Sequence, residues 1–136
     1  TIQQTYSKSP YFNEIFDIIE DLFQNQPSTI SELAINSIIK FSKYLDINTK
    51  FKISSKENYK KGSDKITSLI NICLQEKTKN YINPIGGQSL YNKENFLSYG
   101  VNLNFIQTTP SLSIIDTCMT TSKGKIKEQL NNYKLI

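Results

Sequence analysis

The stretch NYINPIGGQSLY, residues 80–91, decides the fold that we expect for this chain. It opens with a short apolar run at Tyr81-Ile82, which is followed by Asn83-Pro84 and then by the pair Gly86-Gly87. Glycine has no Cβ, so it permits both a positive φ and a close approach of the backbone to another group. The pattern predicts a strand that ends in such a loop, and ligands of open α/β sheets bind beyond the carboxyl ends of strands.

The segments on both sides of this stretch predict an α/β fold. Two further short strands are expected over Phe51–Ser54 and over Val101–Ile106, where apolar and polar residues alternate. Helices are expected where apolar residues recur every three or four positions. These residues are Phe12, Ile15, Phe16, Ile19 and Phe23; Leu33, Ile38, Phe41 and Leu45; Ile66, Leu69, Ile70 and Cys73; Ile114, Ile115 and Cys118; and Ile126, Leu130 and Tyr133. We therefore expect a helical pair followed by a small parallel three-stranded sheet with flanking helices.

Residues that favour helix ends support these elements. The residues that could begin a helix are Thr29, with Glu32 completing a capping box, Ser63, Asn92, Pro110-Ser111 and Ser122. Gly100 could end the short helix that Asn92 begins.

The composition limits the chemistry that this chain can perform. All 16 basic residues are Lys, and the chain has neither Arg nor His, so it lacks the commonest general base and the bidentate guanidinium. Anions must then be held by Lys, by helix N-termini or by backbone amides. The lysines are spread along the chain with few interleaved aromatic residues, which favours a solvated surface over a nucleic-acid interface. No apolar run is long enough to span a bilayer.

The length and the two cysteines indicate a folded protein in a reducing compartment. With 136 residues, the chain fits one domain over residues 1–136. Its only methionine is Met119, and three strands are few for an independent sheet, so we expect a missing N-terminal half that makes this domain the C-terminal part of a longer protein. Cys73 and Cys118 each lie in an apolar helical pattern, which is typical of buried free thiols, and no metal site is expected because nothing nearby completes a four-ligand set.

The Gly-Gly loop is the first candidate ligand site. Asn83 could hydrogen-bond a polar ligand, the amides of Gly86 and Gly87 could approach an anionic or carbonyl group, and Tyr81 and Tyr91 could frame it. The alternative is a plain strand-to-helix turn in which these residues only satisfy backbone geometry. The pattern is neither a dinucleotide fingerprint nor a Walker A loop.

Two further segments carry candidate chemistry. Lys61-Gly62 precedes a helix N-terminus, where an anion could bind, although a solvated lysine on a flexible loop is the alternative. Asp116 and Ser113 could form a functional pair at the start of another helix, where the alternative is an acid that interacts with the helix dipole. Without His or a nucleophile elbow, Ser113 is not expected to be a nucleophile.

These residues together resemble the WbqC-like family. The resemblance is carried by Tyr6, Ser9-Pro10-Tyr11-Phe12, Lys61-Gly62, Tyr81-Ile82-Asn83, Gly86-Gly87, Leu90-Tyr91, Phe96, Gly100-Val101, Leu103, Phe105, Leu112-Ser113-Ile114-Ile115-Asp116 and the closing Leu130, Tyr133 and Leu135-Ile136. The resemblance implies a bacterial, cytoplasmic protein of O-antigen or other surface-polysaccharide biosynthesis. Two features depart from the family, because its N-terminal half is absent here and the segment between Ile106 and Leu112 is shorter than expected.

The resemblance also implies a class of activity. It suggests a transferase that modifies an amino sugar or sugar nucleotide by acyl or aminoacyl decoration, with a sugar nucleotide or an acyl-type donor as the small-molecule partner. Lys61 would then meet an anion, and Asp116 would be the orienting or base group. The alternative is a non-catalytic binding or scaffold component that associates with an enzyme of the same pathway, which the absence of His and Arg favours.

Overall fold

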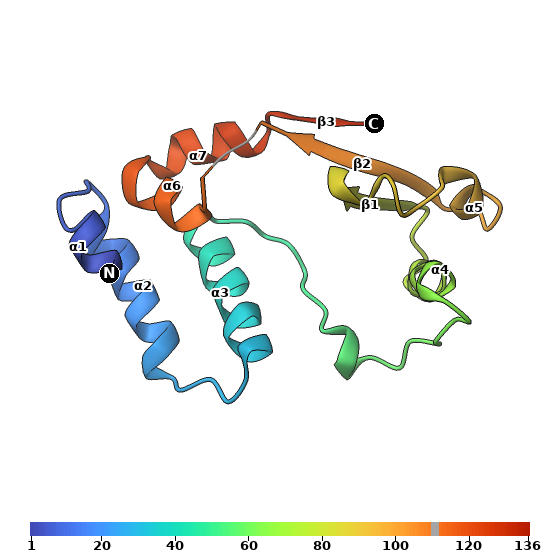
Figure 1. The fold of residues 1–136 in the computed structure, drawn as a ribbon, viewed down its shortest axis with the longest axis horizontal. Coiled ribbons are helices and arrows are strands. Elements are labelled where there is room, and N and C mark those ends of the chain that lie inside the picture. The colour runs from blue at the N-terminus through green and yellow to red at the C-terminus, as the bar shows by residue number, and fades with distance from the viewer. Residues whose placement is uncertain (110–111) are drawn as a thin grey trace. The chain divides into compact units, whose positions relative to one another are not determined.

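The computed structural model describes residues 1–109 and 112–136 and confirms a mixed α/β fold (Figure 1). The described residues form two compact units, each with its own apolar core. Unit 1 comprises residues 1–51 and the described part of 110–132, and unit 2 comprises residues 52–109 and 133–136. The expectation that residues 1–136 act as one domain stays a prediction.

Unit 1 is helical. Its helices are α1 (Ile2–Tyr6), α2 (Phe12–Gln24), α3 (Ile30–Tyr44), α6 (Ile114–Thr120) and α7 (Lys123–Leu130). Thr29 is the N-cap of α3 as predicted, because its hydroxyl accepts a hydrogen bond from the Glu32 amide at 3.1 Å. The Glu32 carboxylate reaches back to the amide of Ser28, at 2.9 Å, rather than to that of Thr29.

The core of unit 1 contains residues from α2, α3, α6 and α7. Its buried residues are Ile15, Ile19, Leu22, Phe41, Tyr44, Leu45, Cys118, Met119 and Ile126. The stripe predicted for α2 is rotated slightly, since Leu22 is buried and Phe23 is 61% exposed. Cys118 is a free, buried thiol, as is Cys73 in unit 2, and both predictions are confirmed.

Unit 2 combines a small sheet with two helices that cover one of its faces. Its elements are η1 (Ser54–Lys56), α4 (Lys65–Gln75), β1 (Asn80–Pro84), η2 (Ile85–Gly87), α5 (Lys93–Leu97), β2 (Asn102–Thr108) and β3 (Tyr133–Leu135). The strand order is β1-β2-β3, with β1 and β2 parallel and β2 and β3 antiparallel. Its buried core consists of Ile70, Cys73, Phe96, Val101, Leu103 and Phe105. The predicted strands over 81–82 and 101–106 are thus confirmed as β1 and β2. The structure shows in addition that they are neighbours in the sheet.

The third strand comes from a part of the sequence that we predicted to be helical. The predicted strand Phe51–Ser54 is wrong, because residues 51–53 have no regular structure and η1 follows. The last helix was expected to reach Tyr133, but it ends at Leu130, and Tyr133 begins β3. The end of the chain thereby pairs with the edge of β2 that does not face β1. The backbones of Ile136 and Phe105 form two hydrogen bonds of 2.9 Å with each other.

The predicted helix ends are largely correct in unit 2. Asn92 caps α5 through its side-chain oxygen, which lies 2.8 Å from the amide nitrogen of Glu94, and Gly100 adopts a φ of +76° after that helix. The N-cap of α4 is Asp64 rather than Ser63, since a carboxylate accepts amide hydrogen bonds more strongly than a hydroxyl. The predicted helix start at Pro110-Ser111 lies outside the described residues.

Candidate functional site

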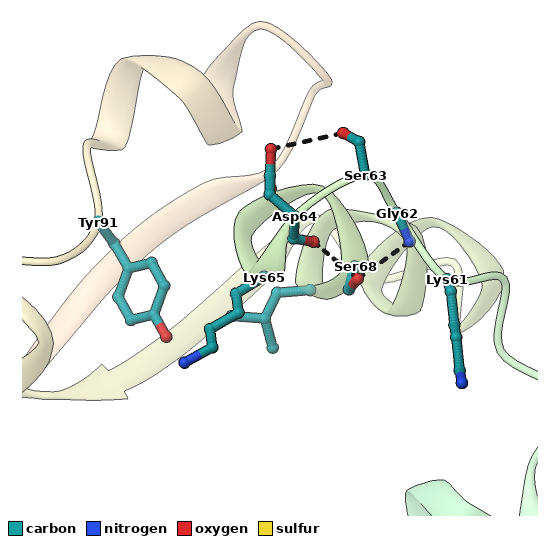
Figure 2. Close-up of a pocket in the computed structure, with 8 residues that line it drawn as sticks. Lys61, Gly62, Ser63, Asp64, Lys65, Ser68 and Tyr91 are labelled. Carbon is teal, nitrogen blue, oxygen red and sulfur yellow. Dashed lines mark hydrogen bonds between the residues drawn. The ribbon is translucent and has the colours of Figure 1, made fainter.

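A hollow of about 530 Å³ lies in unit 2, at the N-terminal end of α4 (Figure 2). It is lined by Lys61, Gly62, Ser63, Asp64, Lys65, Ser68, Leu69 and Tyr91. The hollow thus brings together the predicted segment Lys61-Gly62 and the tyrosine at the end of the Gly-Gly loop.

The segment that carries Lys61 is held along the polar side of α4. Gln75 accepts a hydrogen bond from the Lys60 amide at 2.7 Å and donates to the carbonyl of Asn58 at 3.2 Å. Asn71, one turn earlier, donates to the carbonyl of Lys60 at 3.3 Å. Because these helix residues satisfy the backbone of the segment, Lys61 extends from a defined position.

Gly62 fits this position because no larger residue has room there. A Cβ on Gly62 would lie 2.6 Å from the backbone nitrogen of Ser68 and 2.5 Å from the Cβ of Thr67. The Gly62 amide donates a hydrogen bond to the Ser68 hydroxyl at 3.0 Å. Glycine therefore serves a close backbone contact within the protein here.

Asp64 occupies the N-terminus of α4. Its carboxylate accepts a hydrogen bond from the Thr67 amide at 2.7 Å. This backbone hydrogen bond is the main reason that the pKa of Asp64 lies below its usual range. An anion in the hollow would therefore have to be met by side chains other than this cap.

Two lysines are available for that role. Lys61 and Lys65 both line the hollow, and neither side chain forms an ion pair or hydrogen bond with any residue of 1–109 or 112–136. Figure 2 shows the Tyr91 hydroxyl and the end of the Lys65 side chain turned toward one another, with Lys61 extending beyond Gly62. The Tyr91 hydroxyl also has no hydrogen-bond partner in the described part of the chain.

The Gly-Gly loop helps to position Tyr91 through a close contact at Gly87. A Cβ on Gly87 would lie 2.1 Å from Oδ1 of Asn83 and 3.3 Å from Cδ2 of Tyr91, so only glycine lets both side chains approach. Gly86 has open space around the corresponding position. The loop therefore contains one glycine that its packing requires and one that it does not.

Asn83 and Tyr81 support this arrangement. The Asn83 amide donates a hydrogen bond to the Tyr81 hydroxyl at 2.7 Å. The Tyr81 ring stacks on Phe96 with a centroid distance of 5.6 Å, and Tyr91 meets Phe96 edge-on at 6.2 Å. Burial raises the pKa of Tyr81. These contacts make Asn83 and Tyr81 a packed support beneath the loop, and their contact with a ligand stays a prediction.

Ser113 and Asp116 form a separate cluster within unit 1. Ser113 is the N-cap of α6 and accepts a hydrogen bond from the Asp116 amide at 3.2 Å. The Asp116 carboxylate accepts a hydrogen bond from the Tyr6 hydroxyl at 2.7 Å, and this bond is the main reason that the pKa of Tyr6 is raised. Asp116, which is partly buried, is thus held by a hydrogen-bond partner.

Two functional candidates were missed when the sequence alone was considered. Lys65 lies in a stretch, residues 56–65, that contains four of the lysines, but its place beside Tyr91 follows only from the first turn of α4. Tyr6 meets Asp116 across 110 residues, and no local periodicity indicates such a contact. Within 1–109 and 112–136, no group of three or more His, Cys, Asp or Glu residues could hold a metal ion. No helix in the same ranges combines the length and apolar character needed to cross a membrane.

Comparison with known proteins gives one match. The sequence model of the WbqC-like protein family matches residues 1–128, nearly the whole chain. No curated protein and no solved structure matches.

Proposed function

Because this chain belongs to the WbqC-like protein family, we propose that it acts in bacterial O-antigen or other surface-polysaccharide biosynthesis. The proposed activity is a cytoplasmic transferase that modifies an amino sugar or sugar nucleotide with an acyl or aminoacyl group. The observation that carries the proposal is the hollow in which Lys61 and Lys65, both without partners among the described residues, lie beside Tyr91.

The charge distribution supports an anionic ligand in unit 2. Nine of the 16 lysines, but only four of the 12 acidic residues, fall within residues 52–109 and 133–136. Such an excess attracts anions over the range of a Debye length. Lys is a point-charge donor that suits phosphate oxygens, and the chain has no Arg to compete for that role. A diphosphate group is the anion common to sugar-nucleotide donors, and it would lie between the two lysines.

Asp116 is the candidate orienting or base group of this proposal. A carboxylate can accept a proton from an attacking amine or hydroxyl when it lies within hydrogen-bond reach. The hydrogen bond from the Tyr6 hydroxyl fixes the orientation of this carboxylate. We therefore expect Tyr6→Phe to change the rate of the transfer reaction. We expect Asp116→Asn to abolish that rate while leaving donor binding intact.

Donor binding can be tested by isothermal titration with UDP-N-acetylglucosamine. A charge-assisted hydrogen bond contributes about 1.5 kcal/mol, so we expect roughly tenfold weaker binding for Lys61→Ala and for Lys65→Ala. Lys79→Ala is the matched control, because it removes the same charge from an exposed position of unit 2 outside the hollow. Equal losses in all three variants would show that only the net charge matters, and the site assignment would then fail.

A non-catalytic role is the second candidate. The chain has no His and no Arg, and it carries no nucleophile elbow. A scaffold or binding component would bind a sugar nucleotide and an enzyme of the same pathway without turnover. Product formed by the purified protein with donor and acceptor would rule this candidate out, whereas product that appears only after the partner enzyme is added would favour it.

A further inference from the structure

A second hollow lies next to the first within unit 2. It has a volume of about 550 Å³ and is built from the end of the Gly-Gly loop and the first turn of α5. Tyr91 lines both hollows, and Ile66 of the second directly follows Lys65 of the first in α4. Tyr91 is therefore the residue that the two hollows share.

The linings of the two hollows differ in charge. The first has two lysines without partners and one acid, Asp64, whose carboxylate caps α4, whereas the second has one lysine, Lys93, beside one acid, Glu94. The apolar part of the second hollow comprises Ile66, Leu90, Tyr91 and Phe105. Its remaining lining is dominated by amide and hydroxyl side chains, which form hydrogen bonds without carrying charge. The first hollow therefore suits an anion, and the second suits an uncharged polar group with an apolar face.

Two of the amides in the second hollow are available to a ligand. Gln88 and Asn95 are exposed, and neither side chain has a hydrogen-bond partner among residues 1–109 and 112–136. Asn92 differs, because its side-chain oxygen already caps α5. Gln88 directly follows Gly87, whose position is set by its contacts with Asn83 and Tyr91, so the glutamine starts from a fixed point of the backbone.

We propose that the two hollows are two subsites of one elongated ligand, a sugar esterified to phosphate. This proposal rests on the function proposed above, since the phosphate end lies between Lys61 and Lys65. The sugar ring lies in the second hollow, where Gln88 and Asn95 hydrogen-bond its hydroxyl or acylamino groups. Tyr91 separates the subsites and offers its ring to the sugar and its hydroxyl to the phosphate. The hexose of an N-acylated amino sugar combines the apolar ring face and the neutral polar edge that this lining complements.

The test compares two probes, UDP and UDP-N-acetylglucosamine, on the full chain. The wild-type protein is expected to bind UDP-N-acetylglucosamine about tenfold more tightly than UDP, because only the former reaches Gln88 and Asn95. The double variant Gln88→Ala and Asn95→Ala should lose this advantage to within about twofold while its affinity for UDP stays unchanged. Gln107→Ala is the control, because it removes an exposed amide of β2 that lines neither hollow.

The outcomes separate this proposal from the one on which it rests. If the wild-type protein binds both probes equally, or if the double variant keeps the advantage of the sugar, the second subsite is refuted and the lysine site stands. If neither probe binds the wild-type protein, the proposed function fails and the subsite fails with it. If Lys61→Ala and Lys65→Ala weaken both probes by the same factor while the amide variant weakens only the sugar-bearing one, both proposals are supported.

Discussion

Replacing Gly62 with alanine should be costly, because the segment that carries Lys61 packs directly on the backbone of α4. The new Cβ would lie 2.6 Å from the Ser68 nitrogen and 2.6 Å from the Thr67 carbonyl carbon, and neither atom can move without disturbing the first turn of the helix. Overpacking of this kind costs about 1–3 kcal/mol. Displacing the segment instead would break the hydrogen bond from the Gly62 amide to Ser68, which contributes about 1 kcal/mol, so neither response avoids a loss.

Gly86→Ala is the matched control for this substitution. A Cβ at Gly86 meets no atom within 4 Å, and the residue does not adopt the left-handed conformation. The variant should therefore be neutral or should gain about 0.4–1 kcal/mol through the lower entropy of its unfolded chain. Urea unfolding followed by far-ultraviolet circular dichroism would measure both free energies, and the two variants should differ by about 1–4 kcal/mol.

Hydrogen exchange locates the effect within the molecule. The Lys60 amide donates to the Gln75 side chain, so its protection reports whether the segment stays on α4. In Gly62→Ala this protection should fall, while that of the Phe105 amide in β2, which donates to the carbonyl of Ile136, should change less. A stability within about 0.5 kcal/mol of the wild type, with Lys60 still protected, would refute the reasoning that the segment needs a glycine here.

Three other predictions concern the core and the titrating groups. Phe96→Ala should destabilise unit 2 by about 3–5 kcal/mol because the ring is fully buried, and a loss below about 1 kcal/mol in urea unfolding would contradict this. The hydrogen bonds that Glu76 accepts from Lys52 and Tyr59 lower its pKa, so their stabilisation is present above its unfolded pKa and is lost as the pH falls through the folded one. Glu76→Gln should accordingly weaken the acid dependence of the urea midpoint, and an unchanged slope would argue against the contact. Burial raises the pKa of Cys118 to about 11, so a thiol reagent at about pH 8 should label it only after unfolding, and rapid labelling of the folded protein would show that it is accessible.

Local signals predicted the elements whose ends depend on a few neighbouring residues. Thr29 and Asn92 cap helices with their own side chains, and Gly100 adopts its positive φ directly after α5. Each of these features depends on contacts within about one helical turn, so the local sequence is enough to predict it. The strand of Tyr81 and the alternating strand of Leu103 were predictable for the same reason.

Long-range pairing explains the elements that were predicted wrongly. Phe51 begins a short apolar stretch that looks like a strand, but a strand is stable only with a partner. The partner edge of β2 is filled by Tyr133–Leu135, which pairs with Ile106 and Thr108 from the far end of the chain. Tyr133 also continued the apolar helical pattern of Ile126 and Leu130, so only the pairing could decide between the two structures.

The candidate site shows the same division between local and long-range causes. The Gly-Gly loop indicated a close approach, yet the group that Gly87 approaches is Asn83 of the same loop. Lys61-Gly62 was compatible with a flexible surface loop, and its attachment to Gln75 and Asn71 is visible only once α4 has formed. The pair of Tyr6 and Asp116 joins residues at opposite ends of the sequence.

The sequence alone predicts the α/β class, the helix caps at Thr29 and Asn92, the buried thiols and the segments from which the candidate site is built. These properties follow from periodicity and short-range hydrogen bonding, which act over a few residues. Only the tertiary structure decided that the loop ending at Tyr91 meets the lysines at the start of α4, and that Tyr91 borders two hollows of different charge. The physical reason is that such meetings depend on how helix and sheet faces pack to bury their apolar residues, and many distant residues contribute to that packing at once.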